Sequence, residues 1–65
     1  MNVTVEVVGE DTHDLSLPDP TYCDLLAELD LSPHEVSVMV EGRPVPEDQP
    51  VNAQRVQVLR LIKGG

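Results

Sequence analysis

The pattern of apolar and polar residues predicts an α+β domain, in which one helix packs on one face of a mixed, mostly antiparallel sheet. Several segments alternate apolar and polar residues as half-buried strands do, and one segment between them has apolar residues at helical spacing. Strands on both sides of one helix along the chain are typical of this class. A chain of 65 residues forms one domain with a small core, which we expect over 1–61, followed by a flexible C-terminal tail at 62–65.

The N-terminal part predicts an antiparallel hairpin. Its first strand is expected over 2–8 and its second over 12–17, with a turn at Gly9-Glu10-Asp11 between them. Strands of this kind are half-buried, so one face of each should meet the core. The residues expected on that face occupy alternate positions: Val3, Val5, Val7, His13, Leu15 and Leu17.

A short helix is expected after Pro18-Asp19-Pro20, because proline cannot donate to a strand ladder and therefore ends the second strand. Thr21 is a suitable N-cap, and Asp24 three positions later completes an acidic capping box and favours the positive end of the helix. The apolar positions of the helix share one face, at spacings of three and four: Tyr22, Leu25, Leu26 and Leu29. That face is expected to cover the sheet.

Two further strands are expected after a turn at 31–35. The first spans 36–40, where valines alternate toward the core. Glu41-Gly42 predicts a tight hairpin turn in which glycine supplies a positive φ. The second, at 43–46, is a short edge strand whose prolines protect it from pairing with a neighbour. A polar connecting loop is expected over 47–54.

The last strand is expected over 55–61. Val56 and Val58 alternate toward the helix, which places Leu59 and Leu61 on the opposite face. A sheet that is covered by a helix on one side leaves its other side in contact with water. Leucines on the open side therefore indicate a surface to which a partner docks.

Further residues are expected at this partner-docking surface. Met39 is out of phase with the valines of its strand and joins the same face, and Ile62 lies where the chain leaves it. Arg60 and Lys63 are positive charges on an acidic body, suited to pair with carboxylates of a partner or to remain solvated. The alternative is that strand twist buries some of these residues, or that they are scattered exposed apolar side chains.

Acidic residues dominate the composition, with 12 Asp and Glu against 4 Lys and Arg, for a formal net charge of −8. Such a surface repels phosphate, which argues against direct binding of nucleic acid or of an anionic membrane. No apolar run is long enough to span a membrane, and no secretory signal is recognisable. With one cysteine, the chain forms no internal disulfide. We therefore expect a cytoplasmic protein.

Residues for catalysis or metal binding do not come together in the sequence. Cys23 has no histidine at helical spacing to act as its base, so it is expected to fill the flank of the helix. His13 and His34 are far apart and lack a metal-ligand pattern, and no glycine-rich loop is present to hold a phosphate. We expect a chain that is not an enzyme and that binds no cofactor or metal itself.

The order of the elements, the length and the pair Gly64-Gly65 together resemble the ubiquitin-like β-grasp family over the whole chain. The block TYCDLLAELDLSPHEVSVMVEGRPVPED is similar to the central part of the sulfur carriers of thiamin and molybdopterin synthesis, and VLRLIKGG is close to the VLRL…GG ending of ubiquitin. The acidic composition resembles that of proteins from salt-loving archaea. Taken together, these features resemble the small archaeal modifier proteins, specifically the shorter type that ends in LIKGG.

This resemblance implies two linked activities: attachment to lysines of target proteins, and transport of sulfur as a C-terminal thiocarboxylate for tRNA thiolation. Both would use the carboxylate of Gly65. Because Gly64 and Gly65 lack side chains, they fit a narrow channel, and the stretch from Arg60 to Gly65 can span about 20 Å when extended. The implied partners are a ubiquitin-activating-type adenylating enzyme that uses ATP, the target proteins and a tRNA thiolation enzyme. We expect the modifier itself to be a monomer.

Two alternatives remain open at this point. One is the small, sulfur-donating subunit of molybdopterin synthase, although LIKGG lacks the proline-containing segment that those subunits commonly show. The other is a non-conjugated β-grasp adaptor whose tail is never activated. Lys63 is the only lysine, so it is the candidate acceptor for self-conjugation through lysine, although its closeness to Gly64 disfavours branching there.

Overall fold

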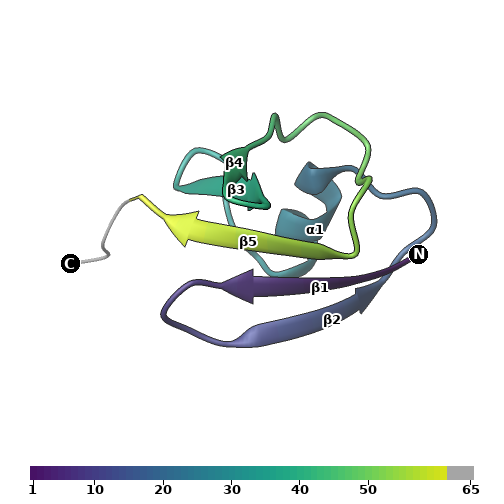
Figure 1. The fold of residues 1–65 in the computed structure, drawn as a ribbon, viewed down its shortest axis with the longest axis horizontal. Helices are drawn as coiled ribbons and strands as arrows, with labels where there is room; N and C mark the ends of the chain where they lie inside the picture. Colours follow the sequence, from purple (N-terminus) through teal and green to yellow (C-terminus); the bar gives the residue numbers. More distant parts are fainter. Residues whose placement is uncertain (62–65) are drawn as a thin grey trace.

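The computed structural model describes residues 1–61 and confirms the α+β class, since in this part of the chain one helix packs on one face of a five-stranded sheet (Figure 1). The strands lie in the order β2-β1-β5-β3-β4, so the last strand lies beside the first, in the middle of the sheet. The elements in chain order are β1 (Asn2–Val7), β2 (Thr12–Ser16), α1 (Tyr22–Glu28), β3 (Val36–Val40), β4 (Arg43–Pro44) and β5 (Arg55–Arg60).

The central strand β5 pairs with neighbours of both directions. It is parallel to β1, with Val5 opposite Val56 and Val7 opposite Val58. It is antiparallel to β3, where Val38 lies opposite Val58. The β1–β2 and β3–β4 pairs are antiparallel hairpins. The sheet is therefore mixed and mostly antiparallel, as predicted.

The core lies between α1 and the sheet face that α1 covers. The valines at alternate positions of β1 and β5 are at most 4% exposed, and the helical leucines Leu25 and Leu26 are 1% exposed. The inward row of β2, by contrast, is only half-buried. The buried core consists of Val3, Val5, Val7, Tyr22, Leu25, Leu26, Val36, Val38, Val51, Val56 and Val58.

Helix α1 begins with the predicted cap. The amide of Asp24 donates to Oγ1 of Thr21 at 3.2 Å, and the amide of Thr21 donates to the Asp24 carboxylate at 2.8 Å. Both halves of the capping box are thus present. The helix ends at Glu28 and Leu29 is its C-cap, whose side chain is half-buried against the core, as its place in the apolar stripe predicted.

The loop between β4 and β5 also holds the start of the helix, which the sequence did not predict. The carbonyls of Glu47 and Gln49 accept hydrogen bonds from the first two amides of α1, at 2.7 and 3.2 Å. These amides have no partner within the helix. Val51 of the same loop is 8% exposed and joins the core, and its amide donates to the carbonyl of Pro20 at 2.8 Å. The loop is therefore a packed part of the domain.

The edge strand β4 is shorter than predicted, and covers Arg43–Pro44 instead of 43–46. The amide of Val45 still donates to the carbonyl of Val38 at 2.9 Å. Beyond Val45 the chain leaves the ladder and enters a turn, in which the amide of Gln49 donates to the carbonyl of Pro46 at 3.3 Å. In the preceding turn, Glu41 and Gly42 both have positive φ, 53° and 78°, which is the backbone of the tight hairpin turn predicted there.

Candidate functional site

Leu59 and Leu61 lie on the sheet face that the helix does not cover, because Val56 and Val58 of the same strand are buried on the other side. Leu59 is 40% exposed and Leu61 is 60% exposed. The amide of Leu61 donates to the carbonyl of Glu35 at 2.8 Å. The backbone therefore stays paired for one residue beyond the end of β5, and both leucines are presented from an ordered part of the sheet.

Met39 and Val8 extend this apolar surface. Met39 is half-buried and lies opposite Gln57, on the diagonal from Leu59. Val8 is 43% exposed, and its amide donates to the carbonyl of Val58 at 2.9 Å, which continues the parallel pairing and brings Val8 beside Leu59. We call Val8, Met39, Leu59 and Leu61 the β5-end surface.

Val8 was not predicted as part of this surface, although the sequence contains a signal for it. Val8 follows the buried Val7 and is an apolar residue at an outward-facing position, just as Met39 is an apolar residue between inward-facing valines. The position of Val8 beside Leu59 could not be read from the sequence, because the β1–β5 pairing joins segments that are far apart along the chain.

Two acidic residues lie beside the β5-end surface, one on each side of β5. Glu6 of β1 lies opposite Gln57 on the open face, and the Gln57 amide nitrogen Nε2 donates to its carboxylate at 3.5 Å. Glu35, just before β3, is exposed, and its carbonyl accepts from the amide of Leu61. A partner that covers this surface therefore needs apolar side chains framed by positive charge.

Arg60 is not part of the β5-end surface. It alternates with Leu59 and Leu61 along the strand, and its Nε lies 2.6 Å from Oε2 of Glu10. The two side chains are 44% and 47% exposed, so this ion pair contributes at most about 1 kcal/mol. It nevertheless joins the β1–β2 turn to the end of β5. The sequence carried no signal for Glu10, since its partner is distant along the chain.

The predicted residues Ile62, Lys63, Gly64 and Gly65 lie outside the described residues. The structure does show where the chain leads into them. The end of β5 lies at the same end of the molecule as the β1–β2 turn, and the N-terminus lies at the other end (Figure 1). The β5-end surface therefore includes Leu61, the last residue that the structure describes before 62–65.

The other candidates from the sequence do not assemble into a site within residues 1–61. Cys23 is exposed, so the expectation that it fills the helix flank was wrong: the helix turns this position away from the sheet. In the described part of the chain, no group of three or more His, Cys, Asp or Glu side chains is arranged to hold a metal ion. None of the described helical structure is long and apolar enough to cross a membrane.

Known proteins resemble this chain over its whole length. Residues 1–62 match the model of the family described as small archaeal modifier protein 2. The chain is 67% identical to the small archaeal modifier protein 2 of Haloferax volcanii, with all of both chains covered. A crystal structure of that H. volcanii protein matches with a TM-score of 0.74 at 66% identity, covering 97% of each chain. An uncharacterized protein of Archaeoglobus fulgidus is 30% identical, again over all of both chains.

Proposed function

The chain belongs to the small archaeal modifier protein 2 family and has the ubiquitin-like β-grasp fold, and from this premise we propose that the carboxylate of Gly65 is adenylated and then attached to lysines of target proteins. Membership of a modifier family implies attachment to other proteins and the need for an activating enzyme. The observation that carries the proposal is the 67% identity to a modifier over the full length of both chains, because the match includes the segment that would react.

Activation is required because a carboxylate is a poor electrophile. An oxygen of the Gly65 carboxylate attacks the α-phosphorus of ATP and pyrophosphate leaves, so that the carboxyl carbon carries AMP as its leaving group. The neutral amine of a target lysine then attacks this carbon. AMP leaves, a proton is released, and an isopeptide bond joins Gly65 to the lysine. In this scheme the chain is the group transferred and not the enzyme, and ATP is bound by the activating partner.

The same adenylate would serve the sulfur-carrier activity. Hydrosulfide attacks the carboxyl carbon of Gly65, AMP leaves and one proton is released, so that a thiocarboxylate remains. A tRNA thiolation enzyme would then take the sulfur from this group, so contact of the acidic chain with tRNA itself is not required. We propose that both the attachment to lysines and the sulfur transfer take place in the cytoplasm, where ATP and the target proteins are available.

The β5-end surface supports this proposal, because it offers the activating enzyme an apolar binding area that includes Leu61, the last described residue before 62–65. We propose that Met39, Leu59, Leu61 and Ile62 contact apolar side chains of the enzyme. Arg60 would leave Glu10 and pair with a carboxylate of the enzyme. Breaking the Arg60–Glu10 pair costs little free energy, because both side chains are nearly half exposed. Lys63, next to Gly64, would meet a second acidic group at the entrance of the active site. Gly64 and Gly65 would pass into that site.

Mass spectrometry of material from the native host tests the proposal. Trypsin cleaves after Lys63, so each modified lysine would carry a remnant made of Gly64 and Gly65. Remnants on other proteins that disappear when Gly65 is deleted support a modifier. An oxygen-to-sulfur mass change of the free chain without remnants would leave a dedicated sulfur carrier, such as the small subunit of molybdopterin synthase. If neither the remnants nor the mass change is found, and deletion of Gly65 leaves partner binding unaffected, the chain would be a non-conjugated adaptor.

Two further variants separate the roles of the tail residues. Lys63→Arg keeps the charge and the trypsin site but removes the acceptor amine, so it should leave remnants on target proteins and abolish any remnant on Lys63. Loss of all conjugation in this variant would show that Lys63 acts in activation. Gly65→Ala should reduce conjugation strongly while the melting midpoint stays the same, because Gly65 lies after the domain expected at 1–61.

A further inference from the structure

The outer edge of the sheet at β2 is available for pairing. β2 stands at one end of the strand order and is hydrogen-bonded to β1 on its other side. Just past its last residue, the amide of Leu17 donates to the carbonyl of Met1 at 3.0 Å, and the Met1 amine donates to the carbonyl of Leu17 at 2.8 Å. In an antiparallel ladder, pairs that exchange both bonds alternate with pairs whose N–H and C=O groups point away from each other. The Met1–Leu17 pair therefore determines which β2 residues face outward.

By this alternation, Thr12, Asp14 and Ser16 direct their backbone N–H and C=O groups away from β1. No strand among residues 1–61 pairs with them on that side. The opposite edge of the sheet is different, because β4 contains Pro44 and is followed by Pro46, which have no N–H to offer. Of the two edges, β2 is the one that can accept a further strand.

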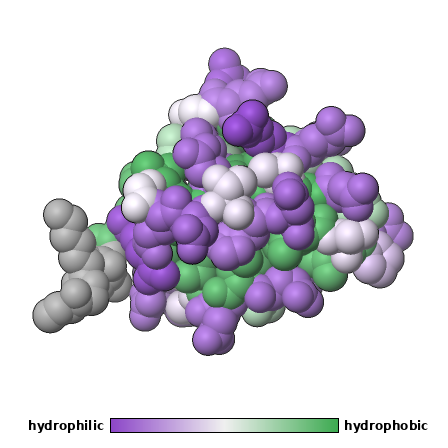
Figure 2. Space-filling view, turned by 90° about the horizontal axis from the view of Figure 1, so that it is seen from below, coloured by the Kyte–Doolittle hydropathy of each residue, from purple (hydrophilic) through white to green (hydrophobic). Residues whose placement is uncertain are grey.

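The side chains on the helix side of β2 are incompletely covered. His13, Leu15 and Leu17 are half-buried, whereas the corresponding valines of β1 are fully buried. Figure 2 views the molecule from the β2 side and shows hydrophobic surface between hydrophilic side chains there. A strand bonded to β2 would place every second side chain beside this row and remove it from water.

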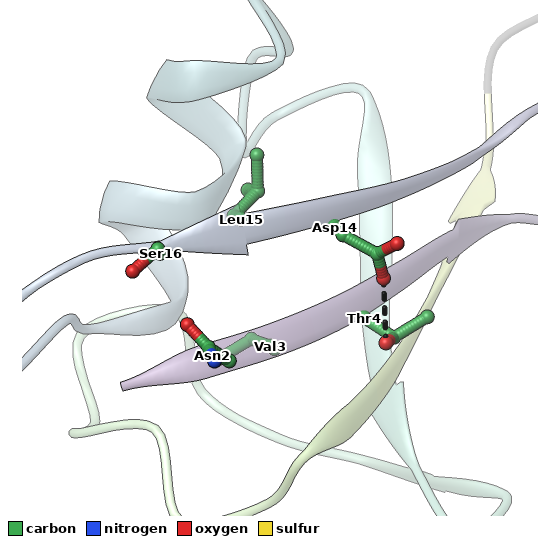
Figure 3. Close-up of a pocket in the computed structure, with 6 residues that line it drawn as sticks. All are labelled: Asn2, Val3, Thr4, Asp14, Leu15 and Ser16. Carbon is green, nitrogen blue, oxygen red and sulfur yellow. Dashed lines mark hydrogen bonds between the residues drawn. The ribbon is translucent and has the colours of Figure 1, made fainter.

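Asp14 is the central side chain of β2 on the open face. Oγ1 of Thr4 donates to Oδ1 of Asp14 at 2.8 Å (Figure 3), which fixes the orientation of the carboxylate. A shallow hollow of about 400 Å³ lies around it. Its lining residues are Asn2, Val3, Thr4, Asp14, Leu15 and Ser16. The hollow has room for a side chain from an added strand, and the nearest charge that such a side chain would meet is negative.

We propose that β2 binds an extended peptide segment of another protein as an additional strand, with a lysine or arginine opposite Asp14 and a β-branched apolar residue on each side of it. The outward backbone groups of β2 would supply the hydrogen bonds, and the alternation of side chains would supply the selectivity. The basic side chain pairs with Asp14 across the strands. Its two neighbours point to the helix side and cover His13 and Leu15.

Charge decides between this partner and a second copy of the chain. Two copies joined at β2 would bring together two bodies of net charge −8. An antiparallel pairing centred on Asp14 would also place two carboxylates directly opposite each other, which is destabilising. A segment with alternating apolar and basic residues avoids both costs. The proposal concerns the outer edge of the sheet, which β1 separates from β5, and it does not depend on the reaction of Gly65.

Blocked seven-residue peptides test the proposal on the intact protein. One carries the central sequence Val-Lys-Val, and its matched control carries Val-Glu-Val. The lysine peptide should shift the NMR resonances of β2 and should bind more tightly than the glutamate peptide in dilute buffer, with a smaller difference in molar salt. Amide hydrogen exchange should slow on binding at Thr12, Asp14 and Ser16, whereas His13 and Leu15 should be protected already in the free protein.

Two substitutions separate the contributions. Asp14→Asn keeps an acceptor for Thr4 but removes the charge. It should lower the affinity for the lysine peptide about two- to fivefold and should not lower the affinity for the glutamate peptide. Ser16→Pro removes one outward N–H without removing a bond to β1, and should abolish binding of both peptides.

Several results would overturn the proposal. These are no binding at millimolar peptide, equal affinity for the two peptides in dilute buffer, or resonance shifts confined to the β5-end surface. Exchange protection of Thr12, Asp14 and Ser16 that rises with protein concentration alone would instead identify a second copy as the occupant. The exchange pattern is measured on the unaltered chain, so it decides the matter even where a substitution disturbs folding.

Discussion

Replacing Leu61 by serine should weaken binding of the activating enzyme while the domain stays folded. Leu61 lies one residue beyond the end of β5, is 60% exposed, and belongs neither to the buried core nor to the side chains packed against it. Its remaining exposed surface is the part that a partner would remove from water. The substitution therefore acts on binding far more than on stability.

The size of the effect follows from the exposed fraction. Complete burial of a leucine side chain is worth about 1.5–3 kcal/mol, so burial of the exposed 60% of Leu61 contributes about 0.9–1.8 kcal/mol. This corresponds to about a 5- to 20-fold loss of affinity. Leu59 is 40% exposed, and the same reasoning gives about a 3- to 8-fold loss for Leu59→Ser. The effect of Leu61→Ser should therefore exceed that of Leu59→Ser.

The assay is ATP–pyrophosphate exchange by the activating enzyme of the same host, with the modifier concentration varied. KM for the modifier should rise in Leu61→Ser while kcat changes little, because the removed contact is made equally in the bound state and in the transition state. Ala27→Ser, an exposed position on α1, is the matched control and should leave KM unchanged. An unchanged KM in Leu61→Ser, or a larger effect in Ala27→Ser, would refute the reasoning.

The remaining predictions concern stability. Thr21→Ala removes half of the capping box and should cost about 1 kcal/mol, seen as a fall of about 4–8 °C in the melting midpoint. Leu26→Ala should lower the free energy of unfolding by about 2–5 kcal/mol. This is a large part of the roughly 3–10 kcal/mol expected for a domain of this length. A urea midpoint close to that of the parent would contradict the burial of Leu26. The melting midpoint of the parent should rise from dilute buffer to molar KCl, because salt shortens the Debye length to about 3 Å at 1 M and screens the repulsion within a chain of net charge −8; equal midpoints would count against this. A double-mutant cycle on Glu10→Gln and Arg60→Gln should give a coupling below about 1 kcal/mol that vanishes in molar salt, and a coupling that persists would show that the pair is less exposed than the structure indicates.

Most of the secondary structure could be predicted because its signals are local. The alternation of valines in β1, β3 and β5 and the stripe on α1 each repeat within a few residues, and all of these positions face the core as expected. The capping box of Thr21 and Asp24 is complete within four consecutive residues. The segment 47–54 is a loop as predicted, but its packing was not predicted: Val51 is buried between the exposed residues Pro50 and Asn52, and no periodicity marks such a position.

The candidate site was predictable to the same extent. Strand alternation correctly placed Leu59 and Leu61 opposite the buried valines, and placed Met39 on the same face. The sequence did not reveal that Val8 lies beside Leu59, nor that Arg60 turns to Glu10. Both depend on the pairing of the first strand with the last, which no short window of sequence contains.

The sequence by itself determined which residues form strands or helix and which face of each element is apolar, and through its resemblance to a family it predicted Gly64 and Gly65 as the reactive residues. Only the tertiary structure decided that β5 lies between β1 and β3, that β2 is left as an open edge, and that Glu6 lies opposite Gln57 of β5. The physical reason is that periodicity and capping arise from interactions among near neighbours in the chain, whereas strand order and register arise from burying all the apolar faces at once. That burial brings residues such as Glu10 and Arg60 into contact from opposite ends of the chain.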